Sequence, residues 1–161
     1  MNQVVVPNFG ELLAPYISTV PEHAVPNFLA LLERGAADRY RYWSSQLPAF
    51  SEGLRACADS EDEIADIVER IFPIEATLGE EIQAPLPAAR ETYYKVFASL
   101  ELADQLAVQA DAELQGANAW RAMLTDDISS TVREGLERCV RLEEASSAYL
   151  YSIIDEVRAS Q

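Results

Sequence analysis

The fold is decided by residues 129–158, which read SSTVREGLERCVRLEEASSAYLYSIIDEVR. Apolar or small side chains return every three or four residues, which is the spacing of one face of an α-helix. Ser129 suits the capping position before such a helix. The stretch therefore predicts one long amphipathic helix that needs other helices to cover its inner face. The inner positions are Val132, Leu136, Cys139, Val140, Ser147, Leu150, Ile154 and Val157.

The same spacing occurs in three further long segments, at about residues 26–47, 52–72 and 100–124. Pro26 suits the first turn of a helix, whereas Pro48 and Pro73 cannot continue the helices that precede them. Ser51 is the expected cap of the second segment, with Ser60 as an alternative start. These signals predict four long helices in all.

The remaining segments have weaker patterns. Residues 73–99 hold two short helical pieces, 75–82 and 88–98, on either side of a proline pair, and are expected to form a long crossover that ends at the helix cap Ser99. Residues 1–25 are expected to form an arm, extended over Val4–Phe9, with a short helix over residues 11–14 that Pro15 ends. We expect a single all-α domain, with helices over 26–72 and 100–158 joined by the crossover.

Composition narrows the class of protein. The chain has 161 residues, 49% of them hydrophobic, which is enough for one domain with a real core. Its formal net charge of -15 argues against nucleic acid and anionic membranes as partners. Residues 1–10 lack a basic segment followed by a long apolar run, so we expect a cytoplasmic protein. Cys57 and Cys139 lie on apolar helix faces and are expected to be reduced core residues.

Glutamates interrupt the apolar faces of these helices. Glu61, Glu113 and Glu143 each fall near the middle of an inward stripe, and Glu33 lies at the edge of the stripe of the first long helix. A buried carboxylate costs several kcal/mol unless a cation or hydrogen-bond donors compensate. The tight turn between the last two helices should bring Glu113 and Glu143 to similar heights. The pattern therefore predicts a polar centre with one carboxylate from each helix.

The order of helices and connections, short, long and short, resembles the ferritin-like superfamily over roughly residues 26–158. The resemblance implies an antiparallel four-helix bundle whose second and third helices are parallel. In the di-iron and di-manganese members, two helices each give one Glu and two each give Glu-x-x-His. By position, Glu33 and Glu113 match the single glutamates, while Glu61 and Glu143 match those of the paired motifs.

The histidines of that pattern are missing from this chain. Ile64 and Ser146 stand at their positions, and His23, the single histidine, precedes the first long helix. A site built from carboxylates and water suits Mn, Mg or Ca better than a tightly held iron pair. The resemblance implies Fe or Mn as the cofactor, and the missing histidines argue against a di-iron oxidase.

A metal-free alternative is a buried salt-bridge network. Arg39 lies at the other edge of the first helical stripe and should reach the height of Glu61 across the turn near Pro48. Tyr40 could add a hydrogen bond. From the sequence we favour this network over a metal centre.

The sequence thus favours a non-catalytic binding or interaction protein that has a degenerate metal site and forms a homodimer or binds a protein partner. Residues 4–9 and the crossover aromatics Tyr93, Tyr94 and Phe97 are the expected contact surfaces. The alternative is a carboxylate-bound metal protein, either a di-metal oxidoreductase or a metal-storage protein. A small-ligand pocket at the polar centre is a third option. Nucleotide-binding and common hydrolase motifs are absent from the sequence.

Overall fold

The computed structural model describes residues 4–161, and these residues form an all-α fold without strands, as predicted. Residues 1–3 of the expected arm lie outside the described part. The α-helices are α1 (Phe9–Ile17), α2 (Val25–Gln46), α3 (Ser51–Ile71), α4 (Ala76–Gln83), α5 (Leu86–Lys95), α6 (Leu102–Ala122) and α7 (Ser130–Ala159). Two short 3-10 helices, η1 (Glu22–Ala24) and η2 (Pro48–Phe50), precede α2 and α3.

Local sequence explains most helix ends. Pro26 lies in the first turn of α2, where a backbone N–H has no partner within the helix, so proline at this position removes no helical hydrogen bond. Pro48 follows the end of α2 and opens η2. The Ser129 side chain accepts a hydrogen bond from the Val132 backbone N–H and so caps α7. The four long segments predicted from periodicity therefore begin and end within about two residues of the expected positions.

Three details at helix ends differ from expectation. Ser51 is the first residue of α3 and not its cap, because the helix begins after Phe50 without a side-chain cap. Pro15 lies inside α1 and does not end it, because in a helix that begins at Phe9 the missing N–H of Pro15 removes only one internal hydrogen bond. Asn8 caps the start of this helix by accepting a hydrogen bond from the Glu11 N–H. Ser99 does not cap α6, which begins after Glu101 without a side-chain cap.

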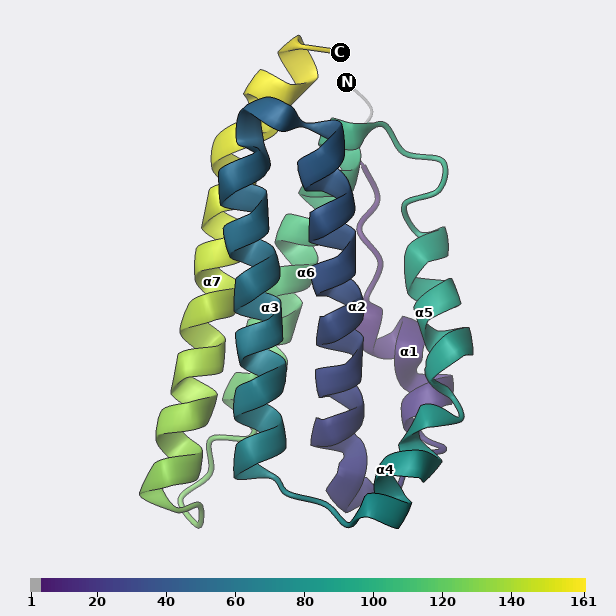
Figure 1. Cartoon of the computed structure of the whole chain (residues 1–161), viewed down its shortest axis with the longest axis vertical. Coiled ribbons are helices and arrows are strands. Elements are labelled where there is room, and N and C mark those ends of the chain that lie inside the picture. Colours follow the sequence, from purple (N-terminus) through teal and green to yellow (C-terminus); the bar gives the residue numbers. More distant parts are fainter. Residues whose placement is uncertain (1–3) are drawn as a thin grey trace.

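The long helices run side by side along the longest axis of the molecule (Figure 1). α2 packs against α3, α3 against α7, and α7 against α6. In Figure 1, α2 and α7 rise while α3 and α6 descend, and the segment holding α4 and α5 returns the chain to the end where α6 begins. α5 packs on α2, and α1 packs between α5 and α6. The helices α1 and α5 therefore cover the side on which α2 and α6 face each other.

The long helices share two buried clusters. One includes Tyr40, Trp43, Leu54, Phe97 and Leu106, together with Leu150. The other includes Ile64, Val68, Ala117, Trp120 and Leu136. A third cluster, which includes Leu13, Phe28, Ile82 and Leu86, joins α1, α4 and α5 to α2. None of the helices in residues 4–161 is both long and apolar enough to cross a membrane.

Candidate carboxylate site

Three buried glutamates from three helices meet where the two main clusters adjoin. Glu61 comes from α3, Glu113 from α6 and Glu143 from α7, and their exposed fractions are 0%, 2% and 2%. One carboxylate oxygen from each lies within 4.8 Å of the others. The helical phase read from the sequence is therefore correct for all three residues, and the structure brings them together.

Glu33 joins this group from α2 and occupies a different position. It is half-buried and lines a cavity beside the cluster, together with Glu113 and Glu143. Its carboxyl group lies beside that of Glu61. Each of the four long helices thus contributes one carboxyl group.

Hydrogen-bond donors hold two of the three buried carboxylates. Glu113 Oε1 accepts from the Tyr40 hydroxyl at 2.8 Å and from Gln109 Nε2 at 2.6 Å. Glu143 Oε1 accepts from Trp120 Nε1 at 2.8 Å. These bonds orient the two side chains and leave Glu113 Oε2 without a donor.

Glu61 is the exception, because neither of its buried oxygens has a donor among the described residues. Its neighbours are other carboxyl groups, and two carboxyl groups form a hydrogen bond only when one is protonated. A fully buried carboxylate without donors is rare in folded proteins. This side chain therefore requires either bound protons or a bound cation.

A glycine makes room for one of the carboxylates. A Cβ atom at position 116 of α6 would lie 2.5 Å from Glu143 Oε1 and 3.1 Å from its Oε2. Gly116 lies one turn beyond Glu113 on the same helix. Its missing side chain lets the carboxylate of α7 approach α6 closely enough to join the cluster.

Burial and mutual repulsion raise the pKa values of these carboxyl groups. Burial, assisted by the charge of Glu113, raises the pKa of Glu33 from 4.5 to about 7, and a protonated Glu61 carboxyl, as a donor to Glu33, would oppose this rise. Burial followed by the charges of the neighbouring glutamates raises the pKa of Glu61 and that of Glu143 well above the usual range. Without a cation, these carboxyl groups therefore bind protons more readily than exposed carboxyl groups do.

The expected partner Arg39 does not reach Glu61. Its Nη2 donates to Gln105 Oε1 at 2.8 Å, and its guanidinium lies 4.9 Å from the Phe97 ring centre and 5.2 Å from that of Trp43. An aromatic environment suits the planar guanidinium, and it draws Arg39 away from the carboxylates. The prediction that Arg39 neutralises Glu61 is therefore wrong.

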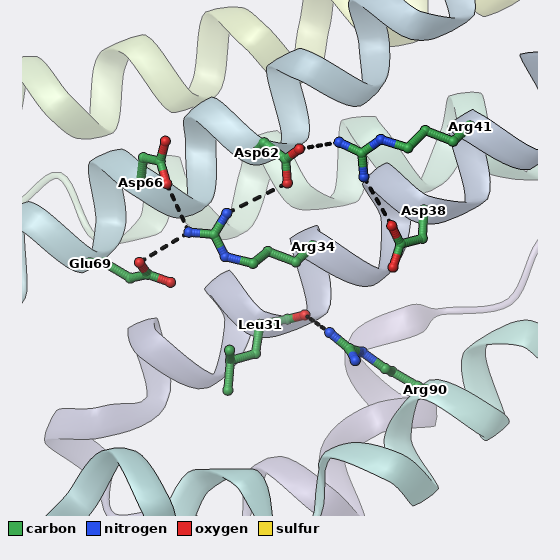
Figure 2. Close-up of polar contacts among 8 residues, drawn as sticks. All are labelled: Leu31, Arg34, Asp38, Arg41, Asp62, Asp66, Glu69 and Arg90. Atoms are coloured by element: carbon green, nitrogen blue, oxygen red, sulfur yellow. Dashed lines mark hydrogen bonds and ion pairs between the residues drawn. The ribbon is translucent and has the colours of Figure 1, made fainter. Parts of the chain in front are cut away.

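Two arginines of α2 are paired with carboxylates on the outside of the molecule. Figure 2 shows Arg34 of α2 between Asp62, Asp66 and Glu69 of α3, and Arg41 between Asp38 and Asp62. Within residues 4–161, none of the ion pairs includes Glu33, Glu61, Glu113 or Glu143. No protein cation therefore compensates the buried charge of the described cluster.

The positions that would carry histidine in the ferritin-like pattern hold core residues. Ile64 is fully buried in the cluster around Trp120, and Ser146 is 3% exposed and lies near the Cys57 thiol. His23 lies exposed in η1 and does not line the cavity. Any metal at this site would therefore take only oxygen ligands from these side chains.

The segments expected to meet a partner pack largely on their own chain. Phe9 is 8% exposed and Phe97 is 0% exposed, and both belong to the core cluster around Trp43. Tyr93 packs against that cluster, while Val5 is 88% exposed. The apolar surface that suggested a partner contact is therefore mostly occupied within the chain. The predicted homodimer loses its main support and stays a prediction.

Sequence reasoning missed the residues that surround the glutamates. Tyr40 was expected near Glu61 but donates to Glu113, and Trp120, for which the sequence indicated no polar partner, donates to Glu143. Gln109 precedes Glu113 by one helical turn and is buried, so an inward amide on the same stripe was the available signal. Cys57 and Cys139 are buried and free, as predicted.

Comparisons of the chain with protein-family models, curated proteins and solved structures find no match. The chemistry of the site must therefore be argued from its own geometry.

Proposed function

We propose that this protein is a carboxylate-ligated metal protein, in which Glu61, Glu113 and Glu143 bind a divalent cation and Glu33 completes the site. The observation that carries the proposal is Glu61, which is 0% exposed and has no donor for either oxygen. A divalent cation would supply the missing charge and satisfy the unpartnered oxygens in one step.

The spacing of the oxygens suits a single ion. Oxygens on opposite sides of a cation are separated by twice the metal–oxygen distance, which is about 4.2 Å for Mg²⁺ and about 5 Å for Ca²⁺. The three oxygens of the cluster lie within 4.8 Å of one another, a limit close to the largest separation that one ion allows. Oxygen-only ligands favour hard cations such as Mn²⁺, Mg²⁺ or Ca²⁺ over Zn²⁺.

Hydrogen bonds from neighbouring residues would preorganise the ligands of this site before the ion binds. Tyr40 and Gln109 fix the carboxylate of Glu113, and Trp120 fixes that of Glu143. Such outer contacts keep ligands in position and reduce the entropy lost on binding. Bound Mn or Fe would supply Lewis-acid or one-electron chemistry beside the cavity.

We also propose that the architecture is ferritin-like. The course of the chain in Figure 1 and the single carboxylate on each long helix support this proposal. The missing histidines argue for metal binding or storage more strongly than for the chemistry of a histidine-held iron pair. The metal-free salt-bridge alternative depended on Arg39, and it loses that support because Arg39 bonds to Gln105.

Metal analysis tests the proposal. Protein expressed with iron and manganese supplied, and purified without chelators or a histidine tag, should contain about one metal ion per chain by plasma mass spectrometry. Glu61→Gln and Glu113→Gln should lose the metal while the far-ultraviolet circular dichroism stays that of a helical protein. Glu80→Gln removes an exposed carboxylate of α4 and is the matched control. Absence of metal, together with no Mn²⁺ binding at millimolar concentrations, would contradict the proposal.

A further inference from the structure

A cavity of about 250 Å³ opens directly onto the carboxylate cluster. It lies between α1, α2, α5 and α6, and side chains such as Phe9, Leu13, Leu32, Ala112 and Trp120 form its walls. At its inner end are three of the four carboxyl groups, those of Glu33, Glu113 and Glu143. The cavity is therefore apolar along its sides and acidic at one end.

Gln115 and Gln109 in its walls have protein partners, whereas the buried Nε of Arg90 has none among the described residues. Gln115 accepts from the Phe9 backbone N–H at 2.8 Å and donates to the Pro7 carbonyl at 2.9 Å, which ties the start of α1 to α6. Arg90 donates through Nη2 to the Leu31 carbonyl at 3.0 Å (Figure 2).

Gln109, the remaining amide in the wall, also has protein partners. Gln109 accepts from the Tyr93 hydroxyl at 2.5 Å and donates to Glu113 at 2.6 Å. A ligand would therefore meet mainly hydrocarbon along the cavity, with the Arg90 Nε and the acidic end as its polar partners.

The volume limits the size of such a ligand. An engineered apolar cavity of about 150 Å³ holds benzene, so a volume of about 250 Å³ accommodates roughly ten non-hydrogen atoms. Apolar walls with a few fixed polar groups are typical of small-molecule sites. The four carboxyl groups exceed the charge of one divalent cation, and this excess of negative charge disfavours an anionic ligand.

We infer that this cavity binds a neutral, apolar small molecule of roughly ten non-hydrogen atoms, with one end placed against the metal-binding carboxylates. The inference rests on the proposed function, because the metal is what would act on or hold that end. The small residues Gly10, Gly116 and Ala119 lie where α1 meets α6, and Ala119 is exposed there, so this seam is the route by which the molecule enters.

Calorimetric titration with indole tests the inference on the full chain loaded with Mn²⁺. Ala112→Phe should fill the cavity and weaken indole binding by about tenfold or more, a change of about 1.4 kcal/mol or more. Ala119→Phe narrows the exposed entrance and is the second variant, in case the first disturbs folding. Ala122→Phe places the same side chain at an exposed position of α6 outside the cavity and is the control. Mn²⁺ affinity is measured separately for each variant by electron paramagnetic resonance.

Binding of indole to the wild type and to Ala122→Phe, lost in the other two variants with Mn²⁺ affinity retained, is the expected result. No binding of indole to a protein that holds Mn²⁺ would overturn the inference and leave the proposed function in place. Binding of indole without any binding of Mn²⁺ would support the apolar site and overturn the metal proposal. Tighter binding of indole-3-carboxylate than of indole, abolished by Arg90→Gln, would overturn the choice of a neutral ligand.

Discussion

Stability of the metal-free protein should fall as pH rises from about 4.5 to 7, and Glu33 sets the size of the effect. Its pKa is raised from 4.5 to about 7 in the folded protein, so the folded state binds more protons than the unfolded state within that window. The protonated carboxyl group makes its full contribution to the free energy of unfolding below pH 4.5, and this contribution is lost as pH rises through 7. At about 1.36 kcal/mol per pH unit, Glu33 alone contributes a loss of about 3 kcal/mol. The pKa values of Glu61 and Glu143 are raised as well, so these groups extend the loss to higher pH.

Urea unfolding of chelator-treated protein between pH 5 and pH 8 measures this loss. General repulsion among the many acidic groups also weakens the fold as pH rises, so the wild type alone is insufficient. Glu33→Gln removes the titrating group and should flatten the dependence by about 2.5 kcal/mol over this pH range. Glu80→Gln removes one exposed carboxylate and should leave the dependence almost unchanged.

Manganese should reverse the trend. Protons and the metal compete for the same oxygens, so Mn²⁺ should stabilise the protein more at pH 8 than at pH 5. At a hundred times the dissociation constant the gain is about 2.7 kcal/mol. The reasoning would be refuted if the free energy of unfolding changed equally with pH in Glu33→Gln and Glu80→Gln. It would also be refuted if the metal-free wild type were as stable at pH 8 as at pH 5.

Three further substitutions probe single contacts. Gly116→Ala should weaken Mn²⁺ binding by about 10–100-fold in a paramagnetic-resonance titration, because the new Cβ would lie 2.5 Å from Glu143 Oε1 and must displace that ligand; unchanged affinity would contradict this placement. Tyr40→Phe removes a donor to the carboxylate of α6 and should weaken Mn²⁺ binding by about 10-fold or more without removing it. Gly53→Ala should lower the free energy of unfolding by about 1–3 kcal/mol despite the better helix propensity of alanine, because the Cβ would lie 2.0 Å from the Tyr149 ring; a higher melting temperature would show that the ring moves freely.

Periodicity was sufficient to predict the helices because it follows from the geometry of the chain itself. The long helix quoted first runs from Ser130 to Ala159, within about a residue of its predicted ends. The inward placement of Glu113 and Glu143 followed from the same spacing, since phase within a long helix changes little when its ends shift. Pro15 was misjudged because a short helix held by tertiary packing tolerates the loss of one hydrogen bond.

The partners of those glutamates could not be derived in the same way. Arg39 was at a suitable height for Glu61, yet it turns to Gln105 and to aromatic rings on neighbouring segments. A long side chain can reach several groups from one backbone position, and the choice depends on which neighbours the fold brings close. Trp120 likewise gained its role only when α7 placed Glu143 against it.

The sequence by itself determined the all-α class, the extents of the long helices and the inward direction of Glu61, Glu113 and Glu143, because these depend on spacing within single helices. Only the tertiary structure decided that the three carboxylates meet without a cation, that Gly116 admits one of them, and that α1 closes a cavity over the cluster. The physical reason is that charge compensation and cavity volume depend on distances between helices, which arise only when the helices pack.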